Sequence, residues 1–487
     1  MHRLLIGVLG ILLIATYFTV GAVPARRGEE AGGERGPAAQ IEARAAVHGD
    51  RSRLAVAAAG DDAASAGEAI ARLREAGPEG LTAFLDANRG RLSEPGVRDA
   101  LDAVAAQKHA YISRLYWYTD LEKAKAAARA EGKPILSLRL LGRLDEELSC
   151  ANSRYFRVAL YANAKISKYL RERFVLHWES VRPAPVFTVD YGDGRKLVRT
   201  ITGNSIHYVL DPDGRIVDAI PGLWGPEAFL REIRTAGEAA REEWAMEPSL
   251  RGQWLAAWHG AQLAALLGER DEAVESEGLG WSEGHGAALA ADFGSTPRYV
   301  PGRLAVGVAV TKMIVERRAV AEVADAGEAN PLGEAGSGLI SADELTPEGW
   351  SRLAARALPE ARLDGRSLDL MRALDVDAIA RSAFPVPGTG TPGAWERAVL
   401  TFERRMAEDT VRNKYHGRAI LHARLAGPDA ESPLPQFNRK VYAALFGTPD
   451  SDPWLGLVAP DTWSGLPRDG LLLAVDVGAD LRRPSRD

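Results

Sequence analysis

Residues 112–237 alternate helical and strand patterns, and this alternation constrains the fold more than any other feature of the chain. Helical spacing covers 120–131, 150–173 and 226–240, whereas apolar runs that suit strands cover 134–141 and 174–178. Two further pairs of short strand patterns flank the turn sequences Tyr191-Gly192-Asp193-Gly194 and Asp211-Pro212-Asp213-Gly214. Such turns join antiparallel strands. The stretch therefore predicts an α/β domain with a sheet flanked by helices.

The chain has 487 residues, which is too long for one ordinary core, so we expect several domains. Helical spacing predicts a small helical region at 63–111 and a large, mainly helical domain at 241–487. The polar residues 26–62 lack periodicity and predict a flexible linker. With the α/β domain at 112–240, the predicted order is helical region, α/β domain and helical domain.

The N-terminus begins with an uncharged, mostly apolar run from Leu4 to Val23, followed by Arg26 and Arg27. Twenty such residues are enough to cross a bilayer, and the small residues near Gly21 also suit signal-peptide cleavage. Residues 1–25 therefore predict either a membrane anchor or a cleaved signal. Both alternatives place the rest of the chain outside the cytoplasm, in the cell envelope or periplasm of a bacterium.

Charge and cysteine content exclude several classes of protein. The formal net charge of −6 gives no support for a nucleic-acid partner. A single cysteine excludes a disulfide-stapled scaffold and a cysteine-rich zinc site. We expect no cofactor and no metal.

The only cysteine, Cys150, stands where a helix is predicted to begin after a strand. Exposed N–H groups and the helix dipole favour a thiolate at such a position. Ser149 is a suitable helix cap, and Arg154 would lower the pKa of the thiol. The acidic run Asp145-Glu146-Glu147 would raise it. A buried, inert cysteine is the alternative.

Several spaced motifs agree with one known pattern. They are Trp117 to Glu122, Gly132-Lys133-Pro134-Ile135, Cys150-Ala151-Asn152-Ser153, the apolar positions Ile166, Leu170, Phe174 and Val175, and the hairpin 208–217. Over residues 112–237 the chain resembles the thioredoxin-like domain family. The resemblance implies a thioredoxin-like central domain with Cys150 at the position of the family's nucleophilic cysteine.

Two departures from that pattern limit the chemistry. Ser153 occupies the position of the resolving cysteine, so the site is a Cys-x-x-Ser variant. The family's cis-proline is also missing, because its position falls near Asn204-Ser205-Ile206, where a trans peptide bond is expected. Cys150 could therefore form only mixed disulfides with partner thiols or disulfides.

Other polar clusters offer weaker alternatives. His177 and His207 fall in predicted strands of one sheet and could share a metal or a proton if they were adjacent, although structural histidines are the simpler interpretation. Trp254, Trp258 and His259 form either a helix-packing cluster or a ligand pocket. The charged segment 403–424 indicates a solvated helical face or an interaction surface. His416 and His422 are six residues apart, which splays them on a helix and weakens a metal interpretation.

Two functions remain open from the sequence. The first is an extracytoplasmic thioredoxin-like protein that handles thiol–disulfide exchange through mixed disulfides at Cys150. The alternative is a redox-inactive thioredoxin-fold scaffold or binding protein at the cell envelope.

Overall fold

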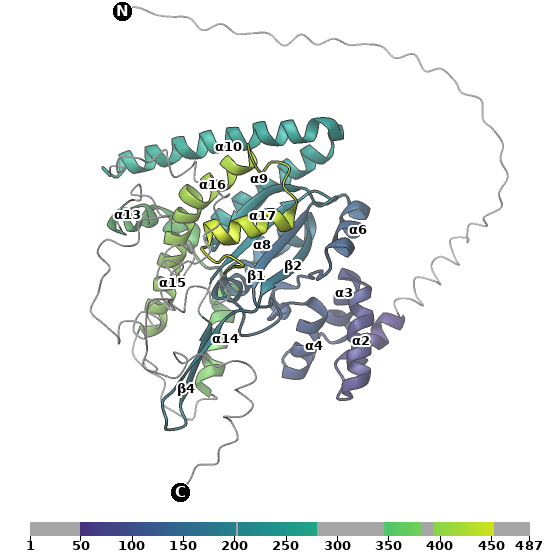
Figure 1. Cartoon of the computed structure of the whole chain (residues 1–487). Helices are drawn as coiled ribbons and strands as arrows, with labels where there is room; N and C mark the ends of the chain where they lie inside the picture. Colours follow the sequence, from purple (N-terminus) through teal and green to yellow (C-terminus); the bar gives the residue numbers. More distant parts are fainter. Residues whose placement is uncertain (1–48, 201–202, 280–344, 346, 381–392, 452–487) are drawn as a thin grey trace, which may run out of the picture. The chain divides into compact units, whose positions relative to one another are not determined.

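In the computed structural model, residues 49–200, 203–279, 345, 347–380 and 393–451 are described. The described residues from Asp50 onwards belong to one compact unit. The predicted anchor or signal at 1–25 lies outside the described residues. None of the described helices is both long enough and apolar enough to span a membrane. Figure 1 shows a mixed α/β fold, with helices beside a central sheet.

The central sheet has four strands in the order β2-β1-β5-β6. Strand β1 (Ile135–Leu141) pairs in parallel with β2 (Val175–Arg182) and antiparallel with β5 (Ser205–Leu210), which pairs antiparallel with β6 (Ile216–Pro221). Every residue of β1, β5 and β6 is buried. These strands are buried because helices cover both faces of the sheet, and they include polar residues such as Ser137, His207 and Asp218. The predicted α/β architecture is confirmed.

The helix that precedes β1 is set by its end residues. In α6 (Leu121–Glu131), the side chain of Asp120 accepts hydrogen bonds from the main-chain N–H groups of Glu122 and Lys123. Gly132 ends the helix with a φ of 62°, which glycine adopts without strain. The predicted helix at 120–131 is thus confirmed to within one residue.

The predicted single helix at 150–173 is wrong, because the chain forms three pieces there. They are α7 (Ala151–Tyr155), the π-helical segment η1 (Phe156–Leu160) and α8 (Ala164–Arg173). The side chain of Asn163 accepts from the N–H groups of Lys165 and Ile166 and so starts α8 afresh. The apolar positions Phe156, Leu160, Ile166 and Leu170 are all fully buried nonetheless.

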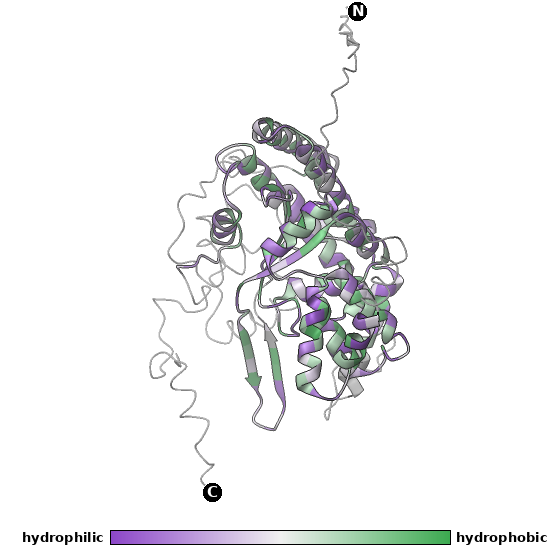
Figure 2. Ribbon diagram, turned by 90° about the vertical axis from the view of Figure 1, so that its right-hand side faces the viewer, coloured by the Kyte–Doolittle hydropathy of each residue, from purple (hydrophilic) through white to green (hydrophobic). Residues whose placement is uncertain are grey.

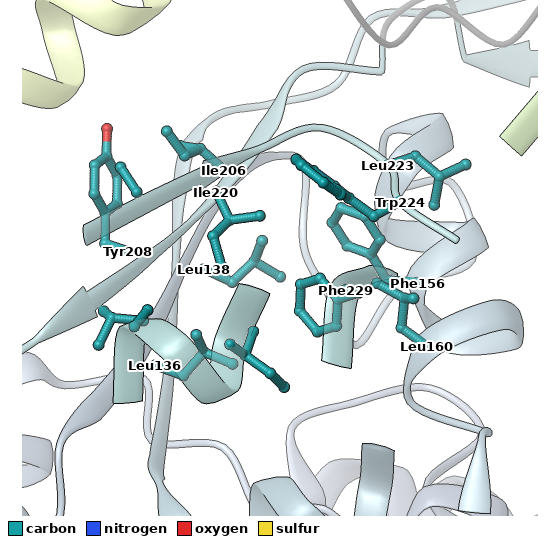
Figure 3. Packing of buried hydrophobic residues seen from close by; sticks show 14 of the residues in the cluster. Leu136, Leu138, Phe156, Leu160, Ile206, Tyr208, Ile220, Leu223, Trp224 and Phe229 are labelled. Carbon is teal, nitrogen blue, oxygen red and sulfur yellow. The ribbon is translucent and has the colours of Figure 1, made fainter. Parts of the chain in front are cut away.

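The main core lies between the sheet and the helices around it. Figure 3 shows Leu138 of β1 and Ile220 of β6 near the rings of Phe156, Trp224 and Phe229. Phe229 belongs to α9 (Pro226–Trp244), the predicted last helix of the α/β region. The buried side chains of α9 recur at helical spacing along one face, as packing of an amphipathic helix on a sheet requires.

A second, smaller core is built from the N-terminal helices α2 (Ala63–Glu75), α3 (Pro78–Ala87), α4 (Pro95–Ala105) and α5 (Ala110–Ser113). This confirms helices in the predicted helical region 63–111. Residues 49–58 are helical too, although they fall in the predicted linker. Ala55 and Ala58 of that helix are buried in this second core, so packing orders a segment whose composition suggested flexibility.

The described residues after 244 are mainly helical, as predicted. Their elements are α10 (Pro248–Ser276), α13 (Pro347–Ala357), η3 (Leu358–Ala361), α14 (Gly365–Ala380), α15 (Ala394–Arg412), η4 (Asn413–Arg418), α16 (Ala419–Leu425), α17 (Leu434–Lys440) and η5 (Val441–Leu445). Many of their apolar side chains join the same hydrophobic cluster as the sheet. The boundary at 240/241 therefore separates segments that share one core.

Strands β3 (Val186–Asp190) and β4 (Lys196–Thr200) form a separate two-stranded hairpin, as its turn sequence predicts. Figure 2 shows that these strands are largely hydrophobic. Val186 and Val198 are 48% and 42% exposed, and Tyr191 in the turn is 55% exposed. The hairpin thus presents apolar side chains to solvent.

Candidate functional site

Cys150 lies directly before α7, at the place where the sequence predicted a helix start. Its main-chain N–H donates to the carbonyl of Leu141 at the end of β1, at 3.1 Å. The side chain has no exposed surface and belongs to the main hydrophobic core. The position of the thiol is therefore that of a core residue.

The two serines near the thiol bind each other. Ser153 Oγ donates to Ser149 Oγ at 2.5 Å and lies 2.9 Å from the carbonyl oxygen of Cys150. Ser149 was predicted to cap the helix, but the cap position is occupied by Cys150, which makes no side-chain cap bond. Ser149 instead precedes the helix by one more residue, and its hydroxyl serves the pair with Ser153.

Arg154 was predicted to support a thiolate. Its guanidinium donates to the carbonyl of Ser149 at 3.3 Å and to Thr200 Oγ1 at 3.0 Å. Burial raises the pKa of the Cys150 thiol, and it outweighs the lowering by Ser153 and by the Arg154 charge. The neutral thiol is thus the favoured form, since desolvation penalises the thiolate.

The far end of the described chain covers the turn that leads into β5. Tyr442 Oη donates to the carbonyl of Asn204, and Asn204 Nδ2 donates to Thr448 Oγ1 at 3.2 Å. Tyr442 is itself buried, and burial raises the pKa of its phenol. The peptide bond between Asn204 and Ser205 is trans, as predicted. Residues 441–448 therefore cover the turn that enters β5.

The two strand histidines are not adjacent. His177 on β2 pairs with Ser137, and His207 on β5 pairs with Leu138, so β1 separates the two strands. Neighbouring β1 residues point to opposite faces of the sheet, and the histidines follow them. His177 Nδ1 lies 2.9 Å from Ser137 Oγ, and His207 Nε2 lies 2.7 Å from Tyr161 Oη. The shared-site alternative for these residues is wrong, and the structural interpretation is supported.

Burial of His207 predicts a loss of stability in acid. Desolvation lowers the pKa of His207 to about 3, whereas an unfolded histidine titrates near about 6.5. As the pH falls, the unfolded state binds the proton before the folded state does. The free energy of unfolding is therefore unaffected by protonation of His207 above about pH 6.5 and decreases as the pH falls from there towards 3. Between pH 7 and pH 5 this decrease is roughly 2 kcal/mol.

Urea unfolding at the two pH values checks this prediction. In His207→Gln, the loss of unfolding free energy between pH 7 and pH 5 should be smaller than in the wild type by about 2 kcal/mol. An unchanged loss in the variant would show that His207 is not held neutral by burial.

The charged segment 403–424 is not a solvated face throughout. Arg412 Nη2 lies 3.0 Å from Glu408 Oε1, one helical turn away on α15. Glu403, Arg418 and His422, however, are buried. The prediction of a solvated face is therefore wrong for these residues, because the segment packs between other elements and pairs its charges internally.

Trp254, Trp258 and His259 form a packing cluster that also includes His422. The two rings stack with centroids 6.4 Å apart, and Trp258 also meets the rings of His259 and His422 edge-on. His259 and His422 lie 163 positions apart, and their Nδ1 atoms are 2.8 Å from each other. His422 thus pairs with His259 and not with His416.

One buried polar cluster was not predicted from the sequence. Asp218 of β6 receives two hydrogen bonds from the Arg418 guanidinium, and its carboxylate lies with His259 and His422 in a group of close ligand atoms. Asp218 and Arg418 are 200 positions apart. Only an unusual polar residue inside the apolar run 216–221 hinted that Asp218 has a partner.

These features define a mixed α/β protein with a thiol buried beside its central sheet. The chain matches no protein-family model, no curated protein and no solved structure.

Proposed function

We propose that the chain is a thioredoxin-fold binding protein of the cell envelope that does not turn over disulfides. The strand order β2-β1-β5-β6, with one parallel pair followed by an antiparallel hairpin, supports the thioredoxin-like assignment. The position of Cys150 between β1 and α7 supports it as well. The cell-envelope location rests on the apolar run Leu4 to Val23.

The burial of Cys150 is the observation that carries the proposal. Thiol–disulfide exchange requires a thiolate that can approach a partner's sulfur in line. Cys150 has no exposed surface, and desolvation favours its neutral form. Ser153 supplies no second thiol, so a mixed disulfide could not be resolved within the chain. Burial therefore favours the scaffold over the exchange protein.

The contacts of residues 441–448 provide further support. A partner peptide that reached the thiol would need the turn before β5, where Asn204 is already bound by Tyr442 and Thr448. Arg182 at the end of β2 also donates to the carbonyl of Thr448, at 2.9 Å. The chain thus fills with its own residues the surface that a peptide substrate would use.

The β3–β4 hairpin is the surface that we assign to a protein partner. Val186 and Val198 lie on the same face, because Thr188 is opposite Val198 and is two residues from Val186. Exposed apolar side chains grouped on one element are typical of interaction sites. Extracytoplasmic proteins are the partners that the proposed location makes available.

Alkylation of the native protein tests this function. We expect Cys150 to resist an alkylating reagent such as iodoacetamide in the folded chain and to react fully in denaturant, because its Sγ is shielded from solvent. Cys150→Ser should keep both the fold and the binding function. The Cys150→Ala variant is the control for loss of the sulfur without a new hydroxyl.

The same experiment decides the second candidate, a monothiol protein that forms mixed disulfides. Its supporting observation is the start of α7 at Cys150, together with the hydrogen bonds that Ser153 directs at this residue. Two results would favour this function over the scaffold. They are rapid alkylation of the native thiol and trapping of partners by the wild type but not by Cys150→Ser.

A further inference from the structure

Three metal-ligating side chains meet where β6 is covered by α10 and α16. Asp218 comes from β6, His259 from α10 and His422 from α16. One potential ligand atom from each residue lies within 4.8 Å of the other two. The three residues are 0%, 1% and 3% exposed, so they form an enclosed site. This cluster is independent of Cys150 and of the proposed function.

The two imidazoles point the same nitrogen at each other. His259 Nδ1 and His422 Nδ1 are 2.8 Å apart, and burial favours neutral rings. A neutral ring has one N–H and one lone pair, so one of these Nδ1 atoms must carry the hydrogen. A cation between the rings would bind both Nδ1 lone pairs and move the protons to the outer nitrogens.

The surroundings of His259 suit a ligand. Its ring is also hydrogen-bonded to the main chain of Val217. Metal-binding histidines usually donate their second ring nitrogen to such a carbonyl, which orients the ring. The indole of Trp258 packs against both imidazoles, with centroids at 4.9 Å and 5.8 Å. The histidine pair is therefore held in place and shielded.

The carboxylate has room for one more bond. Asp218 Oδ1 accepts from Arg418 and from the N–H of Ala219. Oδ2 accepts from Arg418 Nη2 at 2.9 Å and from no other group among the described residues. A carboxylate oxygen has two lone pairs. Oδ2 thus keeps one lone pair for a third ligand bond.

The local charge also favours a cation. Arg418 Nη2 lies 3.2 Å from Glu232 Oε2 as well as binding Asp218. Glu232 also lies 3.9 Å from Arg231, which in turn pairs with Glu360. Three carboxylates therefore share two guanidinium groups, and the cluster has one excess negative charge when both histidines are neutral. In a buried setting this excess attracts a cation more strongly than it would in water.

We propose that Asp218, His259 and His422 form a binding site for a divalent transition metal, with Zn²⁺ as the best match. Two imidazole nitrogens and one carboxylate oxygen are ligands that zinc accepts at about 2.0–2.2 Å. Tetrahedral ligands at such distances lie about 3.3 Å apart, so the rings must separate by roughly half an ångström. A water molecule would be the fourth ligand of this tetrahedron, and the metal would tie α10 and α16 to β6.

Metal titration of the full chain, prepared without a histidine tag and stripped with EDTA, tests the proposal. Co²⁺ is the first probe, because its visible d–d bands report nitrogen and oxygen ligands in low coordination. We expect one equivalent of Co²⁺ to bind, Zn²⁺ to displace it, and Zn²⁺ to raise the unfolding midpoint of the wild type.

Matched histidine variants locate the site. His259→Gln and His422→Gln should each weaken Co²⁺ binding at least 100-fold and abolish the rise in midpoint. His416→Gln should bind like the wild type, because His416 lies outside the cluster on the same helical stretch. Circular dichroism shows whether each variant is folded.

Two results would overturn the site. One is a wild-type chain that takes up neither Co²⁺ nor Zn²⁺ at millimolar concentration, which needs no variant to be folded. The other is binding that His416→Gln removes while His259→Gln and His422→Gln leave it unchanged. Either result would leave the cluster as a metal-free hydrogen-bonded core.

Discussion

Arg418→Met should lower the free energy of unfolding by about 3–5 kcal/mol, because it breaks a buried ion pair from one side. Arg418 binds Asp218 through both terminal nitrogens, and the two side chains are 3% and 0% exposed. The variant would leave the Asp218 carboxylate buried without its cation. Residual charge at such a site is costly because the interior does not solvate it.

Urea denaturation in the presence of EDTA measures this loss without any metal contribution. The double variant Asp218→Asn/Arg418→Met should recover at least half of it, since the unpaired charge is then gone. Arg129→Met is the matched control, because the Arg129–Asp213 pair is 47% and 55% exposed and should contribute at most about 1 kcal/mol. Equal losses in Arg418→Met and Arg129→Met would contradict the prediction.

Phe156→Ala should lower the free energy of unfolding by about 3–5 kcal/mol, the range for an aromatic side chain removed from a packed core. Phe156 is fully buried in η1, and its ring centroid lies 4.7 Å from that of His207 and 6.0 Å from that of Tyr161. Figure 3 shows it beside Leu160 and Phe229. The deletion would leave a cavity between the sheet and two helices.

Thermal and urea unfolding followed by circular dichroism measure this second effect. Tyr191→Ala is the control, since Tyr191 is 55% exposed in the hairpin turn and its loss should change stability by no more than about 0.5 kcal/mol. If Phe156→Ala were as stable as Tyr191→Ala, η1 would not be part of the cooperative core.

Local sequence signals predicted most of the central region. The Asp211–Gly214 turn and the alternating strand patterns around it encode the β5–β6 hairpin within a few residues. The break at Asn163 was missed, because Phe156–Leu160 and Ile166–Leu170 each have helical spacing and the six-residue step between Leu160 and Ile166 was not taken as a break. A cap residue inside a periodic stretch is a weaker signal than the periodicity itself.

The sequence predicted the place of the candidate thiol but not its environment. The apolar run 134–141 and the helical spacing that begins at 150 placed Cys150 after a buried strand and before a helix, as the structure confirms. The electrostatic expectation stayed open, because Arg154 and the acidic residues upstream act in opposite directions. Complete burial raises the pKa of the Cys150 thiol overall, and this burial depends on residues that are remote in sequence.

The sequence by itself determined the strands and turns of residues 112–240, all of their helices except for the break at Asn163, and the position of Cys150 among them, since periodicity and turn chemistry act over a few neighbouring residues. Only the tertiary structure decided that residues 441–448 cover the turn before β5, that Arg418 neutralises Asp218 and that His259 meets His422. These contacts join residues 163 to 244 positions apart. They form because burial requires each polar group to find a partner, wherever in the chain that partner lies.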